Sequence, residues 1–387
     1  MLTLSTFCVI YTAYMYTIIE VTNYAELLDF IRCEGEIWRD DKTHILPFEI
    51  EELSLLSKQN PMLKFCKTKL WYVKDEKGAF VGRIGVIINE LINNKIGIRT
   101  GRFTRIAFID NKEVAALLIN TAKAWLSECG CVRMDGPLGF NNLDRQGALT
   151  MGFDREPSTA SDHTPEYVAR HLIDLGFSPL QEWEEFRLDI RGKMPLTIDY
   201  VCEYVHNKHN IICRTLKRSE FDSYIYKIFD IFNIAFEHLF GTFHFSKEVT
   251  DYYYGMYKSM LHERNIVIAE TEDGQMLGFT IWMPSLSKVQ HRAKGKISLI
   301  DKINFIIQTN RNSTIDLLLS AVLPEWQGRG VAALLAAEVW HQARKIGAKY
   351  VETTAMLVDN KVATQMWRLF PHEQHKRKMA YQLKIEN

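Results

Sequence analysis

The sequence predicts an α/β protein of two tandem domains, each a twisted mixed β-sheet flanked by helices (an α+β mixed sheet). Three observations support this fold class. Hydrophobic residues make up 47% of the 387 residues, which is enough to fill one large core or two ordinary ones. Segments with strand-like alternation are interleaved with segments of helical periodicity. A set of these segments also occurs twice along the chain.

The repetition is clearest in two hairpins that each carry a charged turn containing glycine. The first covers residues 71–88 and the second covers residues 266–281. Gly82 and Gly278 occupy the same place in the two hairpins and are 196 residues apart. A similar pair of later strand-like segments repeats at an offset of 195, from position 188 to position 383. The nearly constant offset indicates a duplicated fold, although two unrelated hairpins of a common kind would look alike.

The repeat places a boundary near residues 191–195. We therefore expect a first domain over residues 15–192 and a second over residues 193–387. Residues 1–14 are apolar and aromatic with no Lys or Arg ahead of them, so they lack the basic start of a signal peptide. They are either an N-terminal extension or a mis-assigned start, with translation beginning at Met15.

Composition limits the partners and the compartment. The 47 basic residues balance the 47 acidic ones, so net charge favours neither a nucleic-acid partner nor a membrane partner. The cysteines are scattered, form no metal-ligand pattern and are typical of reduced thiols, so we expect a cytoplasmic protein without a metal site. These seven residues are Cys8, Cys33, Cys66, Cys129, Cys131, Cys202 and Cys213.

In the first domain, a predicted strand over residues 102–109 leads into an amphipathic helix that stops at Gly130. Asp110 and Glu113 have the spacing of a capping box at its start. We expect the carboxylate of Asp110 to fill the N-terminal anion position, so that this helix binds no phosphate. The polar, glycine-rich stretch 136–147 that follows is either a ligand loop or a structured connection.

The corresponding stretch of the second domain is different. An apolar strand over residues 315–322 leads through a loop with Gly328 and Gly330 into an amphipathic helix. No Ser, Thr, Asp or Asn stands where the helix begins, so no side-chain oxygen caps its first amides. Free amides at a helix N-terminus form an anion site, and Arg329 adds positive charge.

The residues of this loop fit one known pattern. Gln327, Gly330 and Ala332 form Gln-x-x-Gly-x-Ala, and Val322 and Pro324 precede them as Val-x-Pro. This resembles motif A of the GCN5-related N-acetyltransferases (GNAT), which binds the pyrophosphate of acetyl-CoA. The Rossmann and P-loop glycine patterns do not fit. A glycine-rich turn without a ligand is the alternative interpretation.

Further along, Asn360-x-x-Ala363-x-x-Met366-Trp367 resembles motif B of the same family, in which the Asn touches the cofactor arm. The resemblance implies acetyl-CoA as the cofactor. The residues it assigns to cofactor binding are Ala321, Val322, Leu323, Gln327, Gly328, Arg329, Gly330, Val331, Ala332 and Asn360.

The resemblance also implies direct acetyl transfer to an amine. Val322 then supplies the backbone amide that polarises the thioester oxygen. Some members carry an acidic general base eleven residues before the motif Gln, and Asp316 stands there. Burial would raise its pKa, which suits a base, although a structural carboxylate is the other interpretation. Trp367 stands where many members have a Tyr as general acid, so Tyr381, water or unassisted departure of the thiolate must replace that step.

Two segments are expected near the acceptor. Aromatic residues over 236–245, followed by Tyr252, Tyr253 and Tyr254, suit an acceptor with an apolar or cyclic part, or else form core. Residues 285–312 form a basic amphipathic insertion, which covers the acceptor cleft, binds an acidic partner or packs as an ordinary surface helix.

The sequence therefore predicts a GNAT-type N-acetyltransferase with a small-molecule or peptide amine as acceptor. One alternative is a non-catalytic CoA-binding or interaction module, favoured by Trp367 and by the degenerate first domain. Another is a Fem-like aminoacyl transferase, which would need a basic groove for tRNA that the balanced charge disfavours.

Overall fold

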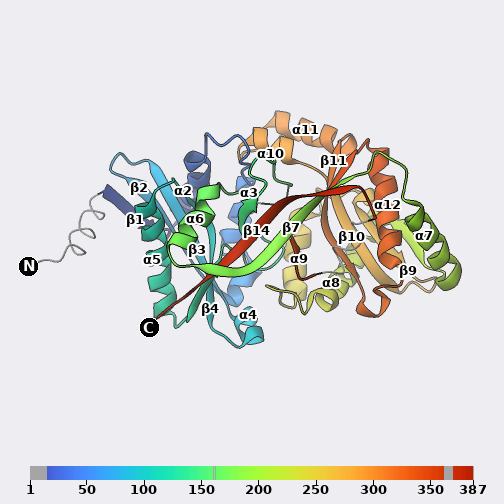
Figure 1. The fold of residues 1–387 in the computed structure, drawn as a ribbon, viewed down its shortest axis with the longest axis horizontal. Coiled ribbons are helices and arrows are strands. Elements are labelled where there is room, and N and C mark those ends of the chain that lie inside the picture. The colour runs from blue at the N-terminus through green and yellow to red at the C-terminus, as the bar shows by residue number, and fades with distance from the viewer. Residues whose placement is uncertain (1–14, 160, 162, 361–368, 387) are drawn as a thin grey trace, which may run out of the picture.

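The computed structural model describes residues 15–159, 161, 163–360 and 369–386. A single mixed sheet of 14 strands runs through the molecule, with helices packed on both of its faces (Figure 1). This confirms the α/β fold class. None of the described helices is both long enough and apolar enough to cross a bilayer.

The first half of the chain runs from β1 to β7. Its first described helix begins with a capping box, in which Asn23 and Glu26 bond each other's backbone amides. Its elements are β1 (Tyr16–Glu20), α2 (Tyr24–Ile37), α3 (Glu49–Leu56), β2 (Cys66–Asp75), β3 (Phe80–Asn89), α4 (Glu90–Ile96), β4 (Thr100–Phe108), α5 (Lys112–Glu128), β5 (Arg133–Gly136), β6 (Ala148–Met151), α6 (Glu166–Asp174) and β7 (Ser178–Asp189).

The second half runs from α7 to β14 and includes the insertion, which forms two helices, the second of them capped by Ser298. Its elements are α7 (Leu196–His209), β8 (Ile212–Thr215), α8 (Phe221–Phe236), α9 (Lys247–Tyr257), β9 (Ile266–Glu270), β10 (Met276–Pro284), α10 (Ser287–Ala293), α11 (Leu299–Asn310), β11 (Thr314–Val322), α12 (Val331–Lys345), β12 (Tyr350–Thr353), β13 (Met356–Leu357) and β14 (His372–Lys384).

The two halves repeat the same series of elements, as the sequence offset predicts. Strands β3, β4 and β5 with helix α5 correspond to β10, β11 and β12 with helix α12. The repeated glycines have a packing reason. A Cβ on Gly82 would lie 2.8 Å from a methyl of Leu118, and one on Gly278 would lie 2.7 Å from the carbonyl oxygen of Ala321. Only glycine lets these strands accept so close a neighbour.

The halves exchange their last strands. β14, from the end of the second half, pairs with β5 of the first half, whereas β7, from the end of the first half, pairs with β12 of the second. The two exchanged strands pair with each other along most of their length in the middle of the sheet (Figure 1). The division at residues 192 and 193 remains a proposal, because the sheet is continuous across it.

One local prediction for the first half is wrong. Asn111 caps α5, accepting a hydrogen bond from the amide of Val114 at 2.9 Å. Asp110 instead accepts hydrogen bonds from Arg170 and His171 of α6. A partner distant in sequence draws the carboxylate away, and the cap moves by one residue. The helix start is still closed by a side chain. Residues 1–14 lie outside the described part of the chain.

Candidate active site

The backbone of β11 parts from its neighbour in the middle of the sheet. β11 and β12 pair in parallel from Thr314 to Leu317. A hydrogen bond from the Thr354 amide to the Leu317 carbonyl extends this pairing by one residue. After Thr354 the chain leaves β11, and its next strand, β13, pairs with β7 instead. The rest of β11, from Leu318 to Val322, keeps only β10 as a described strand partner. A wedge therefore opens between β11 and β12.

Backbone amides of β11 point into this wedge. The amide of Leu323, the residue directly after β11, donates to the carbonyl of Leu277 in β10 at 2.9 Å. Bonding alternates along an antiparallel strand, so the amide of the preceding residue, Val322, faces the opposite edge. The Val322 carbonyl accepts a hydrogen bond of 3.1 Å from the side chain of Gln327, which ties the loop to the strand end.

The start of α12 lies directly after this loop. Gly330 is its N-cap, with φ +88° and no side-chain cap bond, and Gly328 also has a positive φ of +72°. Ala333 is the first residue of α12 whose amide donates to a backbone carbonyl, that of Gly330, at 3.0 Å. Within the described residues, the amides of Gly328, Gly330, Val331 and Ala332 have no protein acceptor. This helix start therefore differs from the capped start of α5.

The surroundings of the loop leave one side open. A Cβ on Gly328 would have no atom within 4 Å, whereas one on Gly330 would lie 2.5 Å from Val205 of α7. Arg329 is exposed, with its guanidinium carbon 5.4 Å from the centre of the Trp326 ring. The free amides and the arginine favour an anionic group on the open side.

Two cavities border β11, one on each face of the sheet. The larger, of about 250 Å³, is lined by Leu318 and Leu319 of β11 together with residues of α8, α9 and the first half. The smaller, of about 30 Å³, is lined by Leu317 and Ser320 together with residues of α12. The part of β11 that borders the wedge therefore lies between a small cavity on the α12 side and a larger cavity between the two halves.

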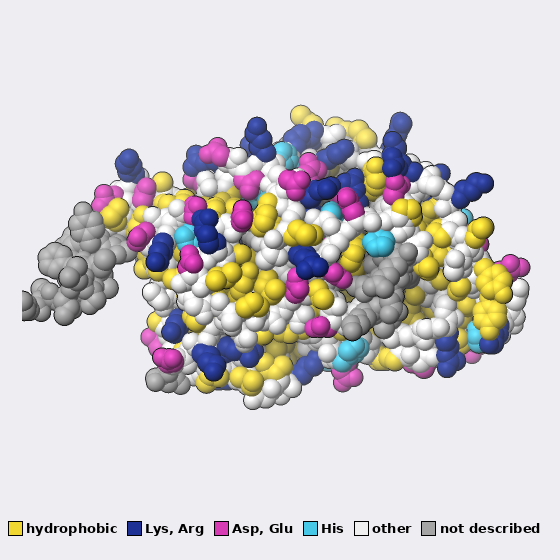
Figure 2. Space-filling model, in the orientation of Figure 1, with side chains coloured by type: hydrophobic (Ala, Val, Ile, Leu, Met, Phe, Trp, Pro, Cys, Tyr) yellow, Lys and Arg dark blue, Asp and Glu magenta, His cyan; other side chains and the backbone are white. Residues whose placement is uncertain are grey.

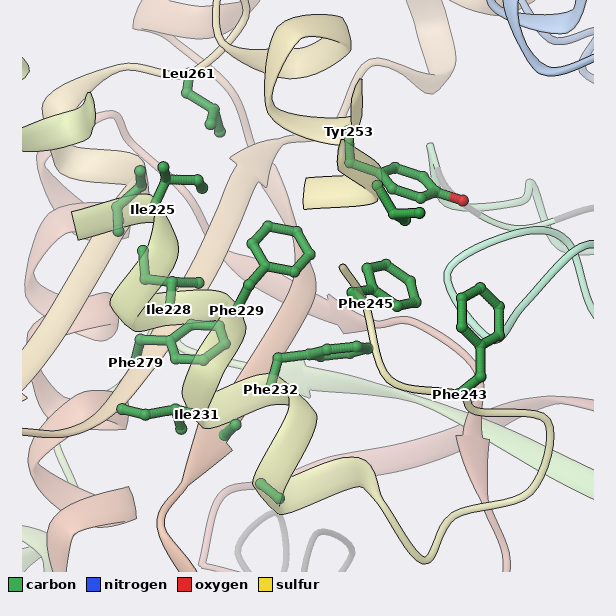
Figure 3. Close-up of a cluster of buried hydrophobic side chains, with 14 of the residues drawn as sticks. Ile225, Ile228, Phe229, Ile231, Phe232, Phe243, Phe245, Tyr253, Leu261 and Phe279 are labelled. Atoms are coloured by element: carbon green, nitrogen blue, oxygen red, sulfur yellow. The ribbon is translucent and has the colours of Figure 1, made fainter. Parts of the chain in front are cut away.

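Aromatic side chains of the second half divide between core and cavity. Phe229 of α8 and Tyr253 of α9 line the large cavity, and Figure 3 shows them side by side with Phe245 in the buried cluster. The Tyr253 hydroxyl accepts a hydrogen bond of 2.8 Å from Asn141 of the first half. Of the predicted aromatic stretch 236–245, no residue lines this cavity, and Phe243 and Phe245 are buried in the core. For Phe243 and Phe245, the core interpretation is therefore right.

The first half supplies acidic side chains to the same cavity. Glu51 of α3 accepts a hydrogen bond of 2.6 Å from the Tyr257 hydroxyl, and burial raises the pKa of its carboxyl. Burial also opposes ionisation of Glu52, but the adjacent guanidinium of Arg105 holds the pKa of Glu52 at about 2. The polar stretch 142–146 lines the cavity as well, which favours the ligand-loop interpretation of that segment.

Asp316 lies behind the wall of this cavity. It is fully buried, and its Oδ2 accepts a hydrogen bond of 2.9 Å from the amide of Thr159, a residue that lines the cavity. Burial raises the pKa of its carboxyl, and its Oδ1 has no partner in the described structure. On the neighbouring strand, Glu352 pairs in register with Asp316.

Lysines of the exchanged strand β14 form a second buried polar group. Lys378 lines the cavity and donates at 2.6 Å to Ser161, which donates at 2.5 Å to Glu185 of β7. Burial by itself would raise the pKa of Glu185, but the neighbouring cations of Lys378 and Lys376 lower it. The sequence predicted neither the acids of α3 nor the lysines of β14 at this cavity. Hydrophobic periodicity does not show which strands the two halves exchange.

Four of the residues named from the sequence lie away from the site or outside the described chain. Tyr381 is buried in the core of the first half, where β14 pairs it with Gly136, so it cannot protonate a thiolate at α12. Ala363, Met366 and Trp367 lie outside the described residues. Asn360, which is described, follows β13 with its amide bonded to the carbonyl of Leu357 at 2.9 Å.

Comparisons with known proteins agree with this geometry. Residues 225–370 match the family model of the acetyltransferase (GNAT) family. The chain is 27% identical to Protein YghO of Escherichia coli (strain K12) over 374 residues, which cover 94% of each chain. That relative's name states no activity.

Solved structures share this fold. A tandem GNAT protein from the clavulanic acid biosynthesis pathway has a TM-score of 0.59 at 12% identity, over 96% of this chain and 99% of that one. A GCN5-related N-acetyltransferase from Sphaerobacter thermophilus has a TM-score of 0.53 at 10% identity, over 96% of both chains.

A third structure contains a GCN5-related glucosamine N-acetyltransferase region within a fungal multi-domain GH3 β-N-acetylglucosaminidase, with a TM-score of 0.59 at 14% identity. The alignment covers 96% of this chain and only 38% of that longer protein. The chain thus matches the GNAT family over residues 225–370 and shares the fold of a tandem GNAT protein along 96% of its length.

Proposed function

We propose that the chain transfers an acetyl group from acetyl-CoA to the primary amine of a small molecule or peptide. The observation that carries this proposal is the start of α12, where successive backbone amides have no acceptor in the described protein and lie beside the open wedge of β11. Such a helix start fits a diphosphate, because the amides and the helix dipole both favour an anion.

The cofactor-binding residues proposed from the sequence fit this geometry. In the proposal, Ala321, Val322 and Leu323 border the pantetheine arm along the wedge, and residues 327–332 hold the diphosphate. Asn360 is proposed to contact the arm from the end of β13. When bound, the cofactor supplies an acyl carbon activated as a thioester. The Val322 amide, which faces the wedge, then stabilises negative charge on the thioester oxygen.

The acceptor is proposed to occupy the large cavity between the halves, because Leu318 and Leu319 place that cavity against the wedge. Its aromatic and aliphatic lining suits the apolar part of an amine. Asp316 is the proposed general base, and its free Oδ1 has the capacity to accept a proton. We also propose a cytoplasmic location, since the six described cysteines are free thiols.

Two measurements test the proposal. Isothermal titration with CoA checks the cofactor site, and release of free thiol from acetyl-CoA with a panel of primary amines checks the reaction. We expect both to be positive. CoA binding without thiol release from any amine would favour the non-catalytic module. Absence of CoA binding would contradict the proposal as a whole.

A further inference from the structure

Helix α11 turns a hydrophobic stripe toward solvent. Its aliphatic residues recur at helical spacing on one side, with side chains between 53% and 78% exposed. These residues are Leu299, Ile300, Ile303, Ile306 and Ile307. No described part of the chain covers them. A surface helix ordinarily turns such a stripe toward the core, so this arrangement is reversed.

The opposite side of α11 is already anchored, which means that the stripe is not a core face awaiting closure. Asp301 is buried and accepts hydrogen bonds from Arg292 of α10 and from Ser298 at the helix cap. Phe305 packs against the hydrophobic cluster that lies between the two halves. The helix therefore holds its orientation through its polar and aromatic contacts, with the aliphatic stripe facing outward.

The exposed charges within the insertion itself are of one sign. Residues 285–312 contain six Lys or Arg against the single acid Asp301, which is buried, in a chain whose net charge is zero. All six are exposed. Figure 2 shows hydrophobic side chains gathered at the edge of the molecule over α11, with Lys and Arg side chains beside them. The six residues are Lys288, Arg292, Lys294, Lys296, Lys302 and Arg311.

We propose that α10 and α11 dock on an anionic lipid bilayer, with the aliphatic stripe entering the interface and the basic side chains contacting the headgroups. A helix with an apolar face flanked by Lys and Arg binds such surfaces in this way. A symmetric contact between two copies of this chain would bring the same lysines together, and their repulsion disfavours it.

The expectation of no membrane partner rested on the net charge of the whole chain, which averages out this local excess. The docking surface is also connected to the proposed acceptor site, since Gln290 of α10 lines the large cavity. Its Oε1 is buried without a hydrogen-bond partner in the described structure. The proposal stands independently of the reaction, because it rests on the exposed stripe of α11 and the basic residues of 285–312 alone.

Vesicle flotation with the full chain tests the proposal. We expect the protein to float with vesicles of phosphatidylcholine and phosphatidylglycerol, and to bind vesicles of phosphatidylcholine alone at least about tenfold more weakly. The triple variant Ile303→Ser, Ile306→Ser, Ile307→Ser should also reduce binding at least about tenfold, because it removes the apolar area that enters the interface. Adding 0.5 M salt should weaken wild-type binding.

A matched control changes exposed aliphatics elsewhere. Ile173→Ser with Leu196→Ser removes two exposed side chains from α6 and α7 and should leave vesicle binding unchanged. Circular dichroism checks that both variants fold. Equal binding of the wild-type protein and the folded triple variant would overturn the proposal. So would a concentration-dependent dimer that the triple variant abolishes, in a protein that binds no vesicles.

Discussion

At the scale of single residues, two acids lie side by side at the centre of the sheet, on strands β11 and β12. Glu352 of β12 lies opposite Asp316 of β11, and burial raises the pKa of Glu352 to about 7. Arg187 and Lys376 lower this pKa without cancelling the effect of burial. The sequence predicted Asp316 through its distance from Gln327. It could not predict Glu352, whose environment is set by strands from both halves.

The raised pKa of Glu352 makes stability depend on pH. The folded protein holds this proton up to about pH 7, whereas the unfolded chain releases it near the ordinary value of 4.5. Stability should therefore fall by about 3 kcal/mol between these two pH values, because the unfolded chain loses its proton there while the folded protein still keeps it. The variant Glu352→Gln should flatten this fall when urea unfolding is measured from pH 4.5 to 8. Parallel curves for the two proteins would contradict the assignment.

Asp316→Asn tests the proposed base. The change keeps the shape of the side chain but removes its ability to take a proton, so kcat/KM for thiol release should fall roughly 100-fold or more. CoA affinity, measured by titration, should stay the same. Glu352→Gln serves as the control and should keep most activity at pH 7. Full activity of Asp316→Asn would instead indicate a structural carboxylate that positions Thr159.

At the scale of elements, the start of α12 sets the site apart from its repeat. Both Gly328 and Gly330 have positive φ, and only the second is pressed against α7. Sequence periodicity predicted this helix and its loop well, because the absence of a capping side chain can be read directly. It predicted the first-half helix but misplaced its cap by one residue, since the partners of Asp110 are about 60 residues away.

A matched pair of glycine substitutions tests this element. Gly328→Ala should cost about 1–2 kcal/mol from the left-handed backbone, because a Cβ there meets open space. Gly330→Ala should cost a further 1–3 kcal/mol, roughly, because its Cβ would also overlap Val205. Thermal unfolding measures both. Equal losses would show that α7 does not pack as described.

Across the whole molecule, the exchange of β7 and β14 joins the two halves into one sheet. Repeat spacing predicted the duplication and the tandem domains. It could not predict which half each final strand would join, because both strands have the same alternating pattern and either sheet satisfies it. The exchange also explains why Tyr381 lies in the first-half core although it comes late in the sequence.

Separate expression of the halves tests the exchange. Residues 15–192 and 193–387 should each be unstable alone, because each lacks the strand that pairs with β5 or β12. Coexpression should recover a soluble complex of both pieces. The measurement is size-exclusion chromatography with circular dichroism. Two halves that fold independently and do not bind each other would contradict the continuous sheet.

A backbone amide NMR titration of the full chain with CoA probes the proposed cofactor site residue by residue. The largest chemical shift changes should fall on Gly328, Gly330, Val331 and Ala332, whose amides have no acceptor in the described protein. The amide chemical shifts of Asn111 to Val114, at the capped start of α5, should not change. Saturating CoA that leaves the α12 amides unchanged, or shifts a different set, would contradict the account.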